Sequence, residues 1–165
     1  MNTSPDLYKE LMGDMTALVS PLFDRSKEQL RQKGSFLPHA AVLTGSAEVQ
    51  HISPDNDFES TDPAEIRAHL CQKLRAMDGK DILAAGIAEK VTEPIETETA
   101  INAIKVLFEH QRGLCVAVCL PFAKRPVIGG YWFRDIVSLL AKPEIRMWEG
   151  LLLEPPVDAP ANAVE

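Results

Sequence analysis

The sequence has little of what marks membrane, secreted or disulfide-rich proteins. Its longest apolar stretch, 114–123, is about half as long as a membrane helix and contains a proline. No apolar run as long as a signal-peptide core follows Met1, so we predict no secretory signal. Three cysteines in 165 residues, an odd number without such a signal, are typical of reduced thiols. We therefore expect a cytoplasmic protein that has no membrane partner.

The motifs of the common catalytic and cofactor sites are also missing from the sequence. It has no P-loop, no Gly-x-Ser-x-Gly elbow, no His-Glu-x-x-His pair and no dinucleotide fingerprint. Two alanines follow His39 where a zinc deaminase has its glutamate, and no Cys-x-x-Cys exists. Cys115 and Cys119 would lie about 13 Å apart on a strand, too far to hold one ion or to form a disulfide. We therefore predict no metal and no cofactor, and an enzyme is the less favoured class.

Charge and composition narrow the possible partners. The chain has 24 acidic and 17 basic residues, a net charge of −7, which does not favour binding to nucleic acid. Hydrophobic residues make up 45% and charged residues 25%, an ordinary globular composition. We expect one domain over 1–150, followed by a mobile, acidic, proline-rich tail over 151–165. The partner we expect is a second copy of the chain or another protein.

The spacing of apolar residues predicts an α+β fold. We expect an N-terminal helix that ends before Gly34, in which Pro21 either kinks the helix or starts a second one. Asp62-Pro63-Ala64-Glu65 combines an N-cap, a proline at the first helical position and a capping-box glutamate, so another helix begins there. The expected strands are 36–43 and 47–52 as one hairpin, 82–88 (with a helix as the alternative), 101–110 and 114–120 as a second hairpin, and 145–148.

Two further segments complete this prediction. Residues 122–130 are expected to form a loop, and 131–140 either a strand or a short helix. The whole is then a two-layer sandwich of the N-terminal and middle helices on a mostly antiparallel sheet of about five to six strands.

The second hairpin predicts two different sheet faces. If residue 110 lies opposite residue 114, the large side chains of Phe108 and Val116 are paired on one face, which would pack under the helices. The other face is small, partly apolar and carries one charge of each sign: Lys105, Leu107, Glu109, Cys115, Ala117 and Cys119. Glu109 beside Cys115 would raise the pKa of that thiol. We interpret this face as an interface with another protein or a shallow ligand pocket. A half-exposed face without a function is the alternative.

A loose set of polar residues provides weak catalytic candidates. His39 lies on the first hairpin, and Glu109, His110 and Arg112 lie at the second. In a regular strand Glu109 and His110 point to opposite faces, so they could act as a pair only across a bulge. A cleft would need His39, Glu109 and Arg112 to converge within about 8 Å, close to the reach of their side chains.

Two stretches resemble a group of small uncharacterised bacterial proteins. GSFLPHAAVL at 34–43 is similar to their Phe-x-Pro-x-Ala strand, which follows a helix. EHQRG at 109–113 is similar to their Glu-x-x-x-Gly hairpin. The resemblance implies an α+β fold and a bacterial origin. The group has no assigned activity, so the resemblance transfers no functional residue to this chain.

The leading hypothesis is a homodimeric domain that acts by protein–protein contact, as chaperones, adaptors and immunity proteins do. The acidic balance, the small-residue sheet face and the missing catalytic motifs favour it, and the comparison with those classes is one of composition alone. The alternative is a small ligand-binding domain or enzyme with a cleft near His39, Glu109 and Arg112. A third reading is a fold without an interface, in which the polar loops act.

Overall fold

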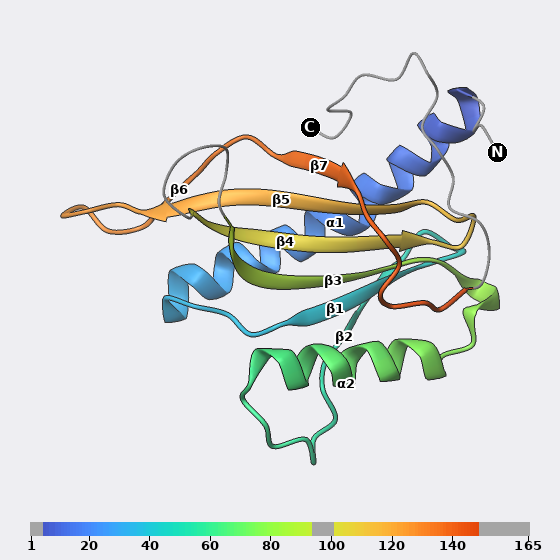
Figure 1. Ribbon diagram of the computed structural model, residues 1–165, viewed down its shortest axis with the longest axis horizontal. Helices are drawn as coiled ribbons and strands as arrows, with labels where there is room; N and C mark the ends of the chain where they lie inside the picture. The colour runs from blue at the N-terminus through green and yellow to red at the C-terminus, as the bar shows by residue number, and fades with distance from the viewer. Residues whose placement is uncertain (1–4, 94–100, 149–165) are drawn as a thin grey trace.

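The computed structural model describes residues 5–93 and 101–148 of the chain. The tail expected over 151–165 lies outside the described residues. The elements are α1 (Pro5–Lys33), β1 (His39–Thr44), β2 (Val49–Ile52), α2 (Pro63–Ala76), a short 3₁₀ turn (Gly79–Asp81), β3 (Ile82–Glu93), β4 (Ile101–His110), β5 (Cys115–Lys124), β6 (Tyr131–Phe133) and β7 (Val137–Leu140). Figure 1 shows the strands as one curved sheet with a helix on either side.

The sheet is antiparallel throughout the described residues, in the order β2-β1-β3-β4-β5-β6, and β7 pairs with β5 beside β6. Both predicted hairpins are present. The predicted α+β class, with helices packed on an antiparallel sheet, is confirmed. The two helices lie on opposite faces of the sheet, so the middle of the sheet is covered on both sides and the layers are three, where two were predicted.

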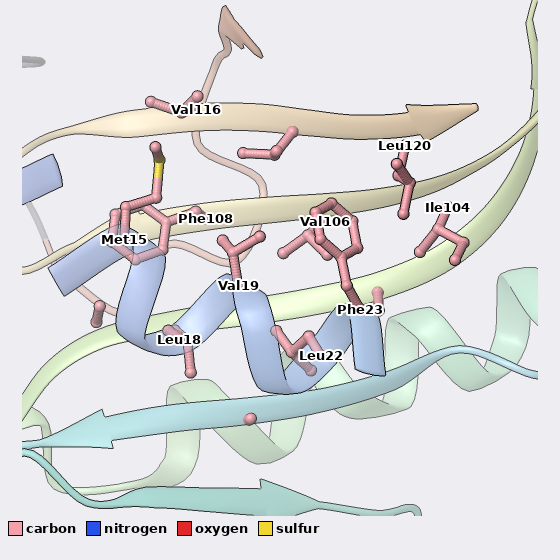
Figure 2. Packing of buried hydrophobic residues seen from close by; sticks show 14 of the residues in the cluster. Met15, Leu18, Val19, Leu22, Phe23, Ile104, Val106, Phe108, Val116 and Leu120 are labelled. Atoms are coloured by element: carbon pink, nitrogen blue, oxygen red, sulfur yellow. The ribbon is translucent and has the colours of Figure 1, made fainter. Parts of the chain in front are cut away.

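α1 covers one face of the sheet with its apolar stripe. Met15, Leu18 and Leu22 are fully buried there against the large side chains of the central strands, among them Phe108 (Figure 2). The helix passes close to β3, since a Cβ added at Gly86 would lie 2.8 Å from a methyl group of Leu22. A side chain at position 86 would therefore push the helix off the sheet.

The expectation of a second helix at Pro21 is wrong, because α1 continues through Pro21 to Lys33 as one helix. A proline removes one backbone donor inside a helix, which costs about 3 kcal/mol. The burial of a long apolar stripe on both sides of Pro21 outweighs that cost, since each fully buried large side chain contributes about 1.5–3 kcal/mol.

α2 begins where the sequence predicts and covers the other face. The Asp62 carboxylate accepts from the amide of Ala64 at 3.2 Å, and Pro63 is the first helical residue. Glu65 does not reach back to the Asp62 amide; the Ser60 hydroxyl accepts from that amide and donates to Glu65. The buried stripe of α2 packs on β1 and β3 and extends to Leu107 of β4.

The register of the second hairpin is the predicted one. Phe108 pairs with Val116, Val106 with Val118 and Ile104 with Leu120, all under α1. Gly113 takes the left-handed conformation, with φ of 99°, that the tight turn needs.

Two predicted segments, 122–130 and 145–148, differ in the structure, and at 131–140 the strand alternative holds. β5 continues through Pro121 to Lys124, so the loop expected from residue 122 begins later. Residues 131–140 form two short strands, β6 and β7, and no helix. Residues 145–148 are not a strand, because their amides bind a buried side chain described below instead of a neighbouring strand. Among the described residues, no helix is both long and apolar enough to cross a membrane.

Candidate functional site

The sheet separates the predicted polar residues from one another. His39 pairs with Ala88, which belongs to the core under α1. Glu109 pairs with Ala85, which belongs to the core under α2. Because paired residues of an antiparallel sheet point to the same side, His39 and Glu109 lie on opposite faces. Arg112 is exposed in the turn after β4. The structure therefore does not bring these three residues into one cleft.

Glu109 binds the backbone of the segment that follows β7. Its buried carboxylate accepts three backbone hydrogen bonds, from the amides of Glu144, Ile145 and Arg146 at 2.8, 2.6 and 2.9 Å. Arg146 takes a left-handed conformation, with φ of 59°, as the chain wraps around the carboxylate. All this places Glu109 as the anchor of the segment after β7.

His110 joins the end of β4 to α1. Its Nε2 lies 2.8 Å from a carboxylate oxygen of Asp14, and its Nδ1 accepts from the Arg112 amide at 3.1 Å. Because Nδ1 accepts, Nε2 carries the hydrogen and donates to Asp14. Burial lowers the pKa of His110, although Asp14 acts in the opposite direction. The ring therefore links β4 to α1, and each of its two nitrogens has a hydrogen-bond partner.

His39 is almost completely buried, with 5% of its surface exposed, and lies 2.8 Å through Nε2 from the Ser26 hydroxyl of α1. Burial, together with the charges of Arg25 and His51, lowers the pKa of His39 to about 4, so the ring is neutral at pH 7. Its Nδ1 is buried and has no hydrogen-bond partner among the described residues. His39 is thus a buried candidate whose ring keeps one nitrogen without a partner in the described part of the chain.

The inner half of the predicted interface face is covered by the chain itself. Leu107 and Cys115 pack with α2 and with Ile145, and Glu109 is buried beside them. Burial, and then Glu109 and Glu144, raises the pKa of Cys115 to about 12, in the direction predicted from the register. These residues are core in the single chain.

The outer half of that face continues into β7. Lys105 and Cys119, both half-buried, form a row that ends at Val137, and Leu107 and Ala117 form a row that ends at Leu139. Strand β7 thus extends the predicted interface face to the edge of the sheet.

The exposed apolar residues of β7 are not among the predicted interface residues. Val137, Leu139 and Leu140 are large apolar residues with 39%, 63% and 58% of their surface accessible, and Trp132 on β6 is exposed as well. The available signal was the uncharged run 136–141, which was ambiguous between strand and helix. Whether this run lies at the edge of the sheet depends on its pairing with β5, a contact between distant parts of the chain that a local sequence pattern does not show.

Comparison with known proteins finds no matching family model, no matching curated protein and no matching solved structure. Within residues 5–93 and 101–148, no group of three or more His, Cys, Asp or Glu side chains could hold a metal ion.

Proposed function

We propose that this chain is a protein-binding domain that forms a homodimer by pairing the free edge of β7 with that of a second copy. The exposed apolar edge of β7 is the observation that carries the proposal. Edge strands of stable monomers usually carry charges, prolines or bulges that prevent pairing. The run 136–141 contains no charged residue and no proline.

The backbone of β7 offers hydrogen bonds on its outer side. The Ala141 amide donates to Cys115 of β5 at 3.1 Å, so by alternation the amides of Val137 and Leu139 also face β5. The amide and carbonyl groups of Ser138 and Leu140 then face outward. None of the described strands pairs with that side of β7. An antiparallel strand from a partner would satisfy these groups.

A second copy fits this edge because the edge is self-complementary. A two-fold axis through Ser138 pairs Val137 with the partner's Leu139 on one face and Ile136 with the partner's Leu140 on the other. Trp132 pairs with Ala123, and Val137 with Cys119, so Trp132 lies on the same face as Val137, about 13 Å further along β5. Trp132 would enlarge the apolar contact beyond Ile136 and the apolar residues of β7. A bacterial, cytoplasmic setting belongs to this proposal, and the buried free thiols of Cys71 and Cys115 support a reducing compartment.

The test is the mass in solution across a tenfold dilution series, measured by light scattering or sedimentation. The wild-type chain should approach twice the 18.2 kDa of one copy as its concentration rises. Leu139→Lys should keep the mass of one copy throughout, because the substitution places like charges near each other at the two-fold axis. Val127→Lys, at a fully exposed apolar residue in the β5–β6 turn, is the matched control and should dimerise as the wild type does.

A wild-type chain that stays at 18.2 kDa at the highest concentration would overturn the proposal. So would a Leu139→Lys variant that dimerises with unchanged affinity. Circular dichroism of both variants verifies that each is folded. Leu107→Arg is not a suitable probe, since Leu107 is buried in the core of one copy and its substitution would unfold the chain.

A further inference from the structure

The hairpin that joins β5 to β6 has an apolar tip. Val127 is fully exposed and Ile128 is 84% exposed, the two highest values among the large apolar residues that the structure describes. Figure 1 shows the hairpin extending beyond the other strands at one end of the sheet. The tip is therefore an apolar surface that no other described element covers.

The backbone of the tip is strained. The Ile128 amide donates to the Pro126 carbonyl at 2.8 Å, and Val127 between them has φ of 69°. A three-residue turn with positive φ is rare, and a β-branched residue at its centre is an outlier. Gly129 and Gly130, the residues that take positive φ without strain, come after this position. Because such outliers cluster at functional sites, the strain favours a role for the Val127 side chain.

The base of the hairpin is fixed to the body of the domain. Phe122 is buried and packs against Tyr131 and Phe133, with ring centroids 5.8 and 6.3 Å apart. The Tyr131 hydroxyl donates to the carbonyl of Gly34 after α1 at 3.4 Å, and Lys27 of α1 lies 5.0 Å from the centre of the Phe133 ring. The last turns of α1 and the hairpin therefore lie at the same end of the molecule.

That end is basic, although the whole chain has a net charge of −7. Residues 24–35 and 121–135, which we call the basic end, together contain seven basic and three acidic residues. Lys124 and Arg125 lie just behind the tip, are exposed, and form no ion pair with a described residue. At about 3.3 Å per residue along the hairpin, they lie about 12 and 8 Å back from the tip. The apolar tip is thus followed by positive charge that no carboxylate of the described residues pairs.

We propose that the hairpin tip docks on an anionic phospholipid surface, with Val127 and Ile128 below the headgroups and Lys124 and Arg125 at the level of the phosphates. Interfacial segments bury apolar side chains about 5–10 Å into the boundary between headgroups and acyl chains, a depth similar to the spacing between the tip and these cations. Basic residues near an anionic leaflet add electrostatic attraction. The expectation of no membrane partner was based on the length of apolar runs, which concerns a spanning helix and not a surface contact.

A lipid surface fits this tip better than a protein cleft does. A projecting tip with two large apolar residues buries much less than the roughly 1,200 Å² of a stable protein interface. A bilayer needs no matching cleft, and its anionic headgroups complement the charge of the basic end. The contact does not use β7, so this proposal and the homodimer succeed or fail separately.

The test is co-sedimentation of the full chain with vesicles of phosphatidylcholine, alone or with about one-third phosphatidylglycerol. The wild type should bind the anionic vesicles and not the neutral ones. Its affinity should fall as salt is raised, because the Debye length shortens from about 10 Å at 0.1 M to about 3 Å at 1 M.

Charge variants locate the contact. Lys124→Gln with Arg125→Gln should weaken binding about 30-fold, since each cation near an anionic surface contributes about fivefold. Lys9→Gln with Lys80→Gln is the matched control, because it removes two exposed lysines and changes the net charge equally. These lysines lie at the start of α1 and in the 3₁₀ turn before β3, at the other end of the molecule (Figure 1). The control should change the affinity by less than about twofold.

Tip variants test the insertion itself. Val127→Gly with Ile128→Ser removes the apolar tip and places a glycine where φ is positive, so the fold and the mass in solution should be unchanged. Its affinity for anionic vesicles should fall at least about tenfold. The separate variant Ile128→Trp should be quenched by lipids brominated in their acyl chains more strongly than the wild type, because the added indole enters the bilayer.

Four results would overturn the proposal. The wild type could fail to bind anionic vesicles at micromolar concentration, or bind neutral vesicles equally well. The two charge variants could lose affinity to the same extent. Finally, the Val127→Gly, Ile128→Ser variant could bind as the wild type does while soluble polyaspartate displaces both from the vesicles, which would assign the basic end to an acidic protein.

Discussion

At the scale of single residues, the buried polar groups of this chain each join two elements. Ser26 and His39 connect α1 to β1, and His110 connects β4 to α1. Glu109 connects β4 to the segment after β7. Sequence patterns identified His39, Glu109 and His110 as polar candidates, but a hydrogen-bond partner up to 96 positions away is not visible in such a pattern. This is why structural roles and candidate catalytic roles could not be told apart before the fold was known.

The low pKa of His39 predicts a loss of stability in acid. Below pH 6.5 the unfolded chain binds a proton at this ring, whereas the folded chain does so only below about pH 4. Acid therefore favours the unfolded state between these values, by up to about 3 kcal/mol at about 1.4 kcal/mol per pH unit.

Urea denaturation of the wild type and His39→Gln at pH 7, 5.5 and 4 measures this effect. The wild type should lose about 3 kcal/mol more of its free energy of unfolding between pH 7 and 4 than the variant does. His110, whose pKa is also lowered, titrates in both proteins and cancels in the comparison. Equal losses in the two proteins would show that His39 is not the group responsible.

At the scale of elements, residues 141–148 act as a strap across the α2 face without being a strand. The Arg75 side chain donates to the carbonyls of Ile145 and Glu144 at 2.6 and 3.0 Å, while Glu109 receives the amides of the same stretch. Ile145 itself is fully buried. The apolar pattern of 145–148 predicted a strand, and this prediction is wrong, because the Glu109 carboxylate binds the amides that a neighbouring strand would otherwise bind.

Glu109→Gln should release this strap. The substitution keeps the size of the side chain but replaces one acceptor oxygen by an amide that faces backbone donors. We expect a loss of about 1.5–3 kcal/mol in the free energy of unfolding, the range for hydrogen bonds to a charged group. Hydrogen exchange at the amides of Glu144, Ile145 and Arg146 should accelerate more than exchange in β3.

Glu48→Gln provides the control, since Glu48 is an exposed carboxylate in the turn before β2. It should change stability by less than about 0.5 kcal/mol. If Glu109→Gln were as mild as this control, the three amide contacts would not hold the strap.

At the scale of the whole molecule, the centre of the sheet is covered twice. β4 contributes Val106 and Phe108 to the core under α1 and Leu107 to the core under α2. Alternation along the sequence was sufficient to predict the register of β4 with β5, because both strands have a strongly apolar face next to a short glycine turn. The placement of α2 on the second face was not predictable in this way, since a helix pattern shows which stripe is buried but not which face of the sheet it meets.

Native-state hydrogen exchange measures this double coverage. The amides of Val106, Leu107 and Phe108 should exchange only through global unfolding, because opening them would expose both cores at once. The amides of β7, which lies at the edge, should exchange through local opening with a lower free energy. Equal protection of β7 and β4 in a sample that is monomeric by mass would contradict the expected difference.

The packing of α1 also has a consequence for synthesis on the ribosome. Leu18 near the middle of α1 belongs to the same core as Val118 of β5, which is 100 positions later in the chain. At about 5–20 residues per second, roughly 5–20 s separate the appearance of the two partners. For that period the apolar stripe of the helix lacks the part of its core that β4 and β5 supply. A chaperone that covers exposed apolar helices would therefore act on this protein early, before its sheet is complete.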